Sequence, residues 1–126
     1  MGLDQYAFTV GKDEGPDNEG LEFAYWRKHN RLQGWMENLW VSKNPNAKER
    51  FNGEKLFLTS DDIVSLEKDI LGLQLPQTSG FFFGNDSYSY AEESKPYADY
   101  DTDMQFLANA KKALDKGLKV YYVCSW

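Results

Sequence analysis

The last nine residues of the chain, LKVYYVCSW (118–126), decide the fold class. Two sets of side chains alternate along this stretch, and both sets are largely apolar or aromatic. One set holds Val120, Tyr122, Cys124 and Trp126, and the other holds Tyr121, Val123 and Ser125. A strand that is apolar on both sides is typical of the centre of a sheet, where both faces are covered. The stretch therefore predicts a central β-strand.

A second strand is expected near the start of the chain, from Leu3 to Val10. Its side chains alternate in the way that a two-faced strand requires. The two sets are Tyr6, Phe8 and Val10 on one face, and Gln5, Ala7 and Thr9 on the other. Residues 11–20, GKDEGPDNEG, have the composition of a loop. A pairing between the first and last strands is a hypothesis that the sequence leaves open.

Three segments carry the spacing of amphipathic helices. The first runs from about Phe23 to Ser42, the second follows the hydroxyl cap Thr59 and stops by Pro76, and the third runs from about Thr102 to Lys116. Gly117 is the expected left-handed stop of the third helix. The apolar stripes are Tyr25, Leu32, Met36 and Leu39, then Ile63, Leu66, Ile70 and Leu73, and last Met104, Leu107, Ala110 and Leu114.

Two short apolar segments complete the pattern. Leu56–Leu58 reads either as a short strand or as the lead-in to a helix, and Phe81–Phe83 reads as a short buried strand. The resulting order of strands and helices predicts an α+β fold. We expect a small, mostly antiparallel sheet of three to four strands, with about three helices packed on one face. Residues 1–126 form a single globular domain in this interpretation.

Composition narrows the classes of function. The 126 residues carry a formal charge of −6, with 41% hydrophobic and 16% aromatic residues. That acidity argues against sequence-blind nucleic-acid binding and against attraction to anionic membranes. No apolar run approaches the length of a membrane span. One cysteine excludes an internal disulfide and fits a reducing compartment, so we expect a soluble cytoplasmic protein, monomeric or homodimeric.

Four motifs occur in a fixed order: MGLDQY at the start, YWRKHN in the expected first helix, GFFFG in the middle, and YYVCSW at the end. Together they resemble a group of small, uncharacterised proteins encoded in phage and some bacterial genomes. The similarity spans nearly the whole chain. It implies a compact phage-type accessory protein of the host cytoplasm, and it brings no established activity. Relatives tend to have histidine in place of Gln33 and serine in place of Cys124.

The run WRKHNR (26–31) is the one locally basic stretch of an acidic chain. On a helix, Arg27 and Arg31 share an outward stripe with Asn30 beside it. Guanidinium groups suit carboxylate or phosphate, and a neighbouring ring can stack on a ligand. The candidate ligand-binding residues are Asp4, Trp26, Arg27, Lys28, Asn30 and Arg31. The alternative is a solvated helix face whose arginines pair with the chain's own acids.

Recognisable catalytic and metal-binding patterns are missing from the sequence. Asp99, Asp101 and Asp103 alternate like the start of a calcium loop, but the glycine and glutamate that such a loop needs are Met104 and Ala110. We interpret these acids as partners of a helix dipole. His29 is the only histidine and Cys124 the only thiol, and we expect both to be structural. No cofactor is implied, and whether the chain is an enzyme stays open, with the balance against it.

The last candidate surface follows the GFFFG motif. Tyrosines of the acidic 87–100 segment either cover the phenylalanines as a lid or form an exposed patch for a partner. The candidate interaction residues are Phe82, Tyr88, Tyr90, Tyr97 and Tyr100. Two functions therefore stand side by side. One is a non-enzymatic, phage-type module that binds a protein, and the other is a binder or enzyme for an anionic or nucleotide-like ligand near Arg27 and Asn30.

Overall fold

The computed structural model describes residues 3–11, 20–27, 29–48, 50–76 and 99–126. The expected strand Phe81–Phe83 and most of the tyrosine-rich segment lie outside these residues. The described elements, in chain order, are the strands β1 (Asp4–Val10) and β2 (Leu21–Arg27), the helix α1 (Asn30–Lys43), the strand β3 (Leu56–Leu58), the helices α2 (Ser60–Leu71) and α3 (Tyr100–Asp115), and the strand β4 (Lys119–Ser125).

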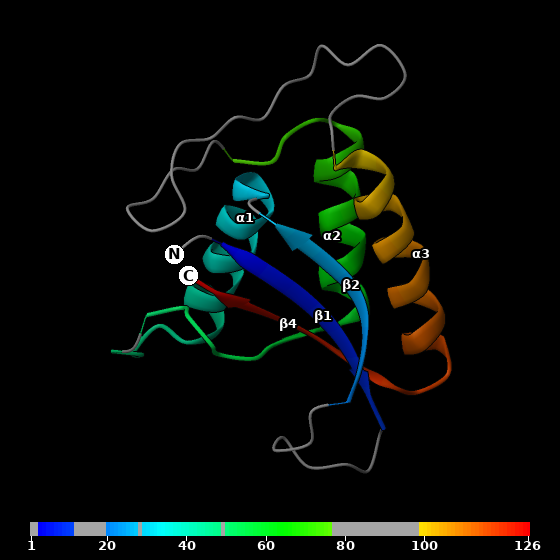
Figure 1. Ribbon diagram of the computed structural model, residues 1–126, viewed down its shortest axis with the longest axis horizontal. Helices are drawn as coiled ribbons and strands as arrows, with labels where there is room; N and C mark the ends of the chain where they lie inside the picture. Colours follow the sequence, from blue (N-terminus) through cyan, green and yellow to red (C-terminus); the bar gives the residue numbers. More distant parts are fainter. Residues whose placement is uncertain (1–2, 12–19, 28, 49, 77–98) are drawn as a thin grey trace.

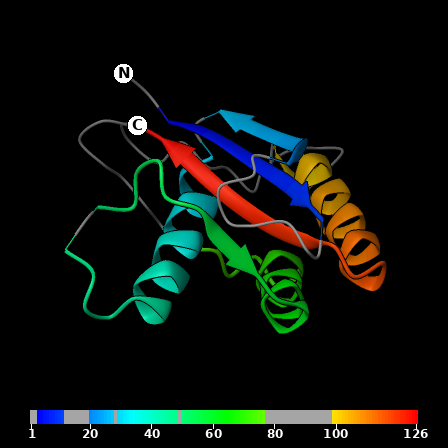
Figure 2. The ribbon, with the colours of Figure 1, turned by 90° about the horizontal axis from the view of Figure 1, so that it is seen from below.

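The four strands form one antiparallel sheet in the order β2-β1-β4-β3. Figure 1 labels β2, β1 and β4, and Figure 2 shows β3 in green beside β4. β4 lies inside the sheet, between β1 and β3, which confirms the central strand that the C-terminal sequence predicts. The first and last strands do pair, from Asp4 opposite Ser125 to Val10 opposite Lys119. Leu56–Leu58 is a strand rather than a helix lead-in. The α+β fold class is confirmed.

The three described helices lie on one face of the sheet (Figure 2). We call that face the inner face and the opposite one the outer face. The core fills the space between the inner face and the helices. Its fully buried members come from every element and include Ala7, Leu32, Met36, Leu66, Leu107 and Tyr122. On β1 the inner set is the one that contains Gln5 and Ala7, so Tyr6 and Phe8 point to the outer face.

The expected helix from Phe23 to Ser42 is wrong in its N-terminal third. Residues Leu21–Arg27 form β2, an edge strand paired with β1 from Asp4 opposite Arg27 to Thr9 opposite Leu21. Aromatic side chains favour strands because they fit a pleated surface, and β1 offers this segment a row of backbone hydrogen-bonding groups. The ring of Trp26 packs edge-on against the ring of Phe106 in α3, and the two ring centroids are 5.2 Å apart. Tertiary pairing outweighs the helical spacing here.

Local interactions and backbone geometry determine where the helices begin and end. Thr59 caps α2 in a capping box, in which its hydroxyl accepts from the Asp62 N–H at 3.1 Å and the Asp62 carboxylate accepts from the Thr59 N–H at 2.9 Å. Gly117 follows α3 with φ of 82°, which confirms the expected left-handed stop. Leu73, expected on the α2 stripe, lies beyond the end of that helix and is exposed.

Candidate functional site

Aromatic rings cross the outer face of the sheet from edge to edge. We call the set the aromatic row: Tyr25 of β2, Tyr6 and Phe8 of β1, Tyr121 of β4, and Phe57 of β3. Successive ring centroids lie 5.2, 6.4, 5.0 and 5.4 Å apart along the row. These distances are within the range of favourable ring contacts. The row is therefore one connected surface and not a set of isolated side chains.

The row is most exposed at its Tyr25 end and least exposed at Tyr121. Tyr25 is 46% exposed, while Tyr6, Phe8 and Phe57 are half-buried. Tyr121 is buried, with Phe8 stacked on its ring and the Lys55 ammonium 4.9 Å from its ring centroid. A cation over a ring face is an attractive contact.

Asp4 and Arg27, two of the candidate ligand-binding residues, occupy the β2 end of the outer face. They are opposite each other across β1 and β2. The Tyr25 hydroxyl donates to Asp4 Oδ1 at 2.7 Å. This hydrogen bond, with lesser effects of burial and of the Asp4 charge, raises the pKa of Tyr25 above its ordinary value, because a phenolate would face a carboxylate. Tyr25 thus stays a neutral donor near neutral pH.

The other candidate ligand-binding residues lie away from Asp4 and Arg27. Trp26 and Asn30 are buried on the inner side, at 2% and 4% exposure. Arg31, in the first turn of α1, donates to the Leu75 carbonyl at 3.2 Å. Lys28 is outside the described residues. Because Arg27 is on a strand and Arg31 on a helix, the two do not share the stripe that the sequence suggested. The described members of this set are divided between the outer face of the sheet and the buried inner side.

Trp26 belongs instead to a buried polar cluster that the sequence does not predict. The Asp103 carboxylate, in the first turn of α3, accepts from Trp26 Nε1 at 2.8 Å through Oδ1. Its Oδ2 lies 2.8 Å from His29 Nε2. Asp103 is fully buried, and His29 is 2% exposed. His29 is the residue immediately before α1, so the cluster joins β2, the start of α1 and α3.

A chain of hydrogen bonds continues from His29 across the inner face of the sheet. The Gln5 side chain accepts from the His29 N–H at 2.8 Å and donates to the His29 carbonyl at 3.0 Å. Gln5 also donates to the Tyr122 hydroxyl at 2.9 Å, which in turn donates to Gln33 at 2.6 Å. Gln33 donates to Cys124 Sγ at 3.2 Å. Gln33 and Cys124 are therefore in direct contact.

The Tyr122 and Cys124 side chains in this chain of hydrogen bonds are fully buried. Burial raises the pKa of Tyr122 well above its ordinary value, and burial raises the pKa of Cys124 to about 11. Both groups are therefore neutral hydrogen-bonding groups in the native protein. Within the described ranges, no group of three or more His, Cys, Asp or Glu residues is arranged to hold a metal ion. Nor is any helix of those ranges long and apolar enough to cross a membrane.

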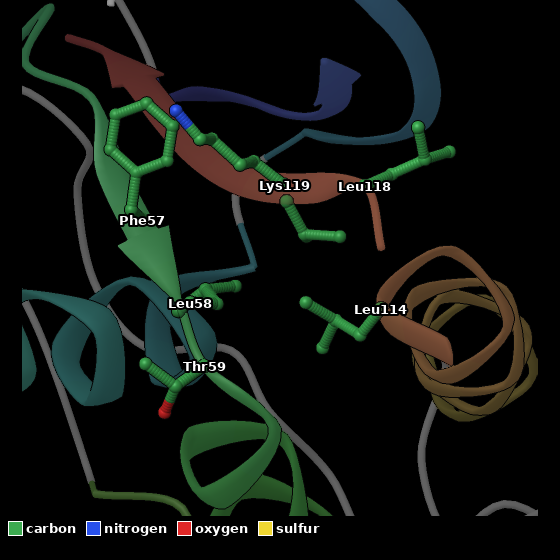
Figure 3. Close-up of a pocket in the computed structure, with 7 residues that line it drawn as sticks. Phe57, Leu58, Thr59, Leu114, Leu118 and Lys119 are labelled. Carbon is green, nitrogen blue, oxygen red and sulfur yellow. The ribbon is translucent and has the colours of Figure 1, made fainter. Parts of the chain in front are cut away.

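A pocket of about 540 Å³ lies between the short edge strand β3, the end of α3 and the start of β4. Five of its lining residues are apolar, namely Phe57, Leu58, Leu114, Leu118 and Val120. Thr59 and Lys119 complete the lining. Figure 3 shows Leu58 and Leu114 reaching toward each other across the pocket, with Phe57 and Lys119 together at its margin.

The candidate interaction residues of the tyrosine-rich segment are mostly outside the described structure. Phe82, Tyr88, Tyr90 and Tyr97 all fall in the range 77–98, so their interaction role stays a prediction. Tyr100 is the first residue of α3, where it is half-buried and packs against the core. This residue supports the fold at the start of the helix.

Comparison with known proteins adds no further lead. The chain matches no protein-family model, no curated protein and no solved structure. Any functional inference therefore depends on the geometry of its own residues.

Proposed function

We propose that the chain is a non-enzymatic interaction module that binds a protein partner on the outer face of its sheet. The observation that supports this proposal is the aromatic row, which crosses all four strands on a face that none of the described helices covers. Tyrosine and phenylalanine are enriched at protein interfaces, where their rings bury a large area in few rotatable bonds. The exposed Tyr25 and the half-buried Tyr6, Phe8 and Phe57 give a partner apolar contact area on both sides of the buried Tyr121.

The charges of the outer face indicate the chemistry of the partner. Arg27, Lys55 and Lys119 lie on this face, against the acids Asp4 and Glu22. Among these described residues the three cations outnumber the two acids, in a chain whose formal charge is −6. Complementary charges steer encounter and fix register at an interface. The partner that fits is a protein surface with apolar side chains bordered by carboxylates.

The polar cluster of the core supports a binding role over catalysis. Trp26, His29, Asp103 and Cys124 are each buried, and Trp26 Nε1, His29 Nε2 and the Cys124 thiol each have a hydrogen-bond partner within the buried interior. A catalytic acid, base or nucleophile has to reach its substrate. The phage-type accessory role that the resemblance implies, and a reducing host cytoplasm suited to one buried thiol, belong to the same proposal.

Site-specific photo-crosslinking in living cells tests the proposal. A photoreactive phenylalanine analogue replaces Tyr25 in one variant and Leu71 in a matched control, because both side chains are about half exposed, at 46% and 56%, on opposite layers of the fold. We expect a discrete protein adduct from position 25 and none from position 71. Adding Lys55→Glu should reduce the adduct severalfold, because it replaces a cation at the row with an anion.

The proposal fails if position 71 crosslinks as efficiently as position 25, or if Lys55→Glu leaves the adduct from position 25 unchanged. The first result would place the partner on another surface, and the second would show that the charge at position 55 does not contribute to binding. Circular dichroism of each variant shows that the fold is retained, so a lost adduct is not a lost structure.

A further inference from the structure

Most of the residues that line the pocket beside β3 are apolar. Leu58, Leu114 and Val120 present aliphatic side chains, and Phe57 adds a ring at the margin. The pocket exists because β3 has three residues and covers only part of β4, from Leu56 opposite Tyr122 to Leu58 opposite Val120. After Leu58 the chain enters α2, so β3 does not extend far enough to cover the last turn of α3.

The size and surface of the pocket suit a small molecule. Ligand sites in proteins are commonly apolar clefts of about 300–1,000 Å³ with a few polar groups that set orientation, and 540 Å³ lies inside that range. Water against aliphatic walls forms few hydrogen bonds with them. Displacing it by an apolar group is favourable in proportion to the apolar area that is covered.

Charge selects among apolar ligands. Lys119 is the one charged residue in the lining, and it stands at the margin beside Phe57 (Figure 3). An ammonium group favours an anion and disfavours a cation at that margin. Thr59, the other polar lining residue, already accepts a hydrogen bond from the Asp62 N–H in the α2 cap.

We propose that this pocket binds an amphiphilic carboxylate, with its aliphatic body between Leu58 and Leu114 and its carboxylate at Lys119. The site is separate from the partner surface in function, although Phe57 and Lys119 contribute to both. The ion pair is partly solvated at the margin, so its contribution is modest, and the apolar body provides most of the affinity.

Titration of the whole protein with three ligands of equal length tests the assignment. Octanoate, octanol and octylammonium share the aliphatic body and differ in the head group. Methyl chemical shifts of Leu58, Leu114 and Val120 report binding in the pocket. We expect all three residues to shift with octanoate and octanol, and octanoate to bind about fivefold more tightly, the ratio that corresponds to about 1 kcal/mol. Octylammonium should bind the most weakly.

Two variants separate the charge from the cavity. Lys119→Glu should reverse the order of octanoate and octylammonium while leaving octanol unchanged, and Lys112→Gln, an exposed lysine of α3 outside the lining, is the matched control. Leu114→Trp should fill the cavity and abolish all three titrations. Amide shifts of β1 and β4 show whether that variant keeps its sheet.

Two results would overturn the assignment. If none of the three ligands shifts the three methyl sets, the pocket is not a ligand site. If octanoate and octanol bind equally and Lys119→Glu changes neither, the pocket is apolar without selection for an anion. Neither result bears on the partner surface, which is read separately through crosslinking at Tyr25.

Discussion

The carboxylate of Asp103 and the imidazole of His29 meet at 2.8 Å, and each side chain is only 1% exposed. They bring the first turn of α3 against the segment that leads into α1, while the second carboxylate oxygen holds the indole of Trp26. A buried carboxylate is expensive unless its oxygens are satisfied. The junction of β2 and α1 therefore depends on one acid from the far end of the chain.

Replacing that acid should be among the most damaging changes to the fold. Asp103→Ala leaves the Trp26 N–H and the His29 ring without their partner in a dry interior, so we expect the free energy of unfolding to fall by about 3 kcal/mol or more. Urea denaturation measures the loss. Asp101→Ala, an exposed acid in the same helical turn, should change stability by no more than about 0.5 kcal/mol. Equal effects of the two substitutions would contradict this role for Asp103.

The thiol of Cys124 should be inert in the native protein. Burial raises its pKa from 9.0 to about 11, so at pH 8 its thiolate fraction is about a hundredfold below that of an ordinary thiol. We expect a disulfide reagent to react with the native chain only as fast as the chain opens, and at once after denaturation. Rapid stoichiometric reaction without denaturant would show that Cys124 is accessible.

The capping carboxylate of α2 should give stability a defined pH dependence. Burial alone would raise the pKa of Asp62, but the Lys43 ammonium at 2.6 Å and the Thr59 N–H outweigh it and lower this pKa below 3.8. Because the folded-state pKa is below the unfolded one, the stabilisation is complete above the unfolded pKa and is lost as the pH falls through the folded pKa.

Asp62→Asn should accordingly cost about 1 kcal/mol at pH 7 and progressively less below about pH 4, where wild type also loses its charge. Denaturation series at several pH values measure the difference. Asp61→Asn, an exposed neighbour in the same turn, supplies the control and should show a smaller, flatter effect. A cost for Asp62→Asn that does not vary with pH would contradict the predicted linkage.

Two glycines with left-handed backbones should respond differently to a methyl group. A Cβ on Gly20 would lie 2.2 Å from the Thr9 carbonyl oxygen, whereas a Cβ on Gly53 would meet no heavy atom within 4 Å. Both changes incur the cost of φ near +75°, about 1 kcal/mol. Gly20→Ala also forces position 20 away from the Thr9 carbonyl, so we expect a loss of about 3 kcal/mol. Thermal unfolding of the two variants measures the gap, and similar melting temperatures would contradict the steric argument.

The parts of the fold that sequence alone predicts are those with a local signature. β4 is apolar on both sides, α2 begins with a hydroxyl and acids, and α3 is followed by Gly117, so each is readable within one segment. β2 was missed because Tyr25 falls by coincidence on the same helical stripe as Leu32 and Met36. The aromatic residues between positions 23 and 26 were the signal that favoured a strand.

The candidate sites were harder to predict because their members come from distant segments. Trp26 and Asp103 are 77 positions apart, and nothing within either segment specifies the other. One clue was available. Helical spacing puts Asp103 on the same stripe as Phe106, Leu107 and Ala110, which are all buried. A buried acid needs a hydrogen-bond partner, so this position predicts one. The aromatic row likewise needed the strand order before its members could be joined.

The antiparallel pairing of β1 with β4 also fixes how the molecule responds to mechanical force. Asp4 lies opposite Ser125, so the first and last strands meet at the same end of the sheet (Figure 1). Tension applied between those two ends would pull the strands apart sideways and load their hydrogen bonds one after another. A parallel pair would instead share the load in shear. A chain threaded from either end by an unfolding motor would therefore open along this seam first, and each released pair would expose the next.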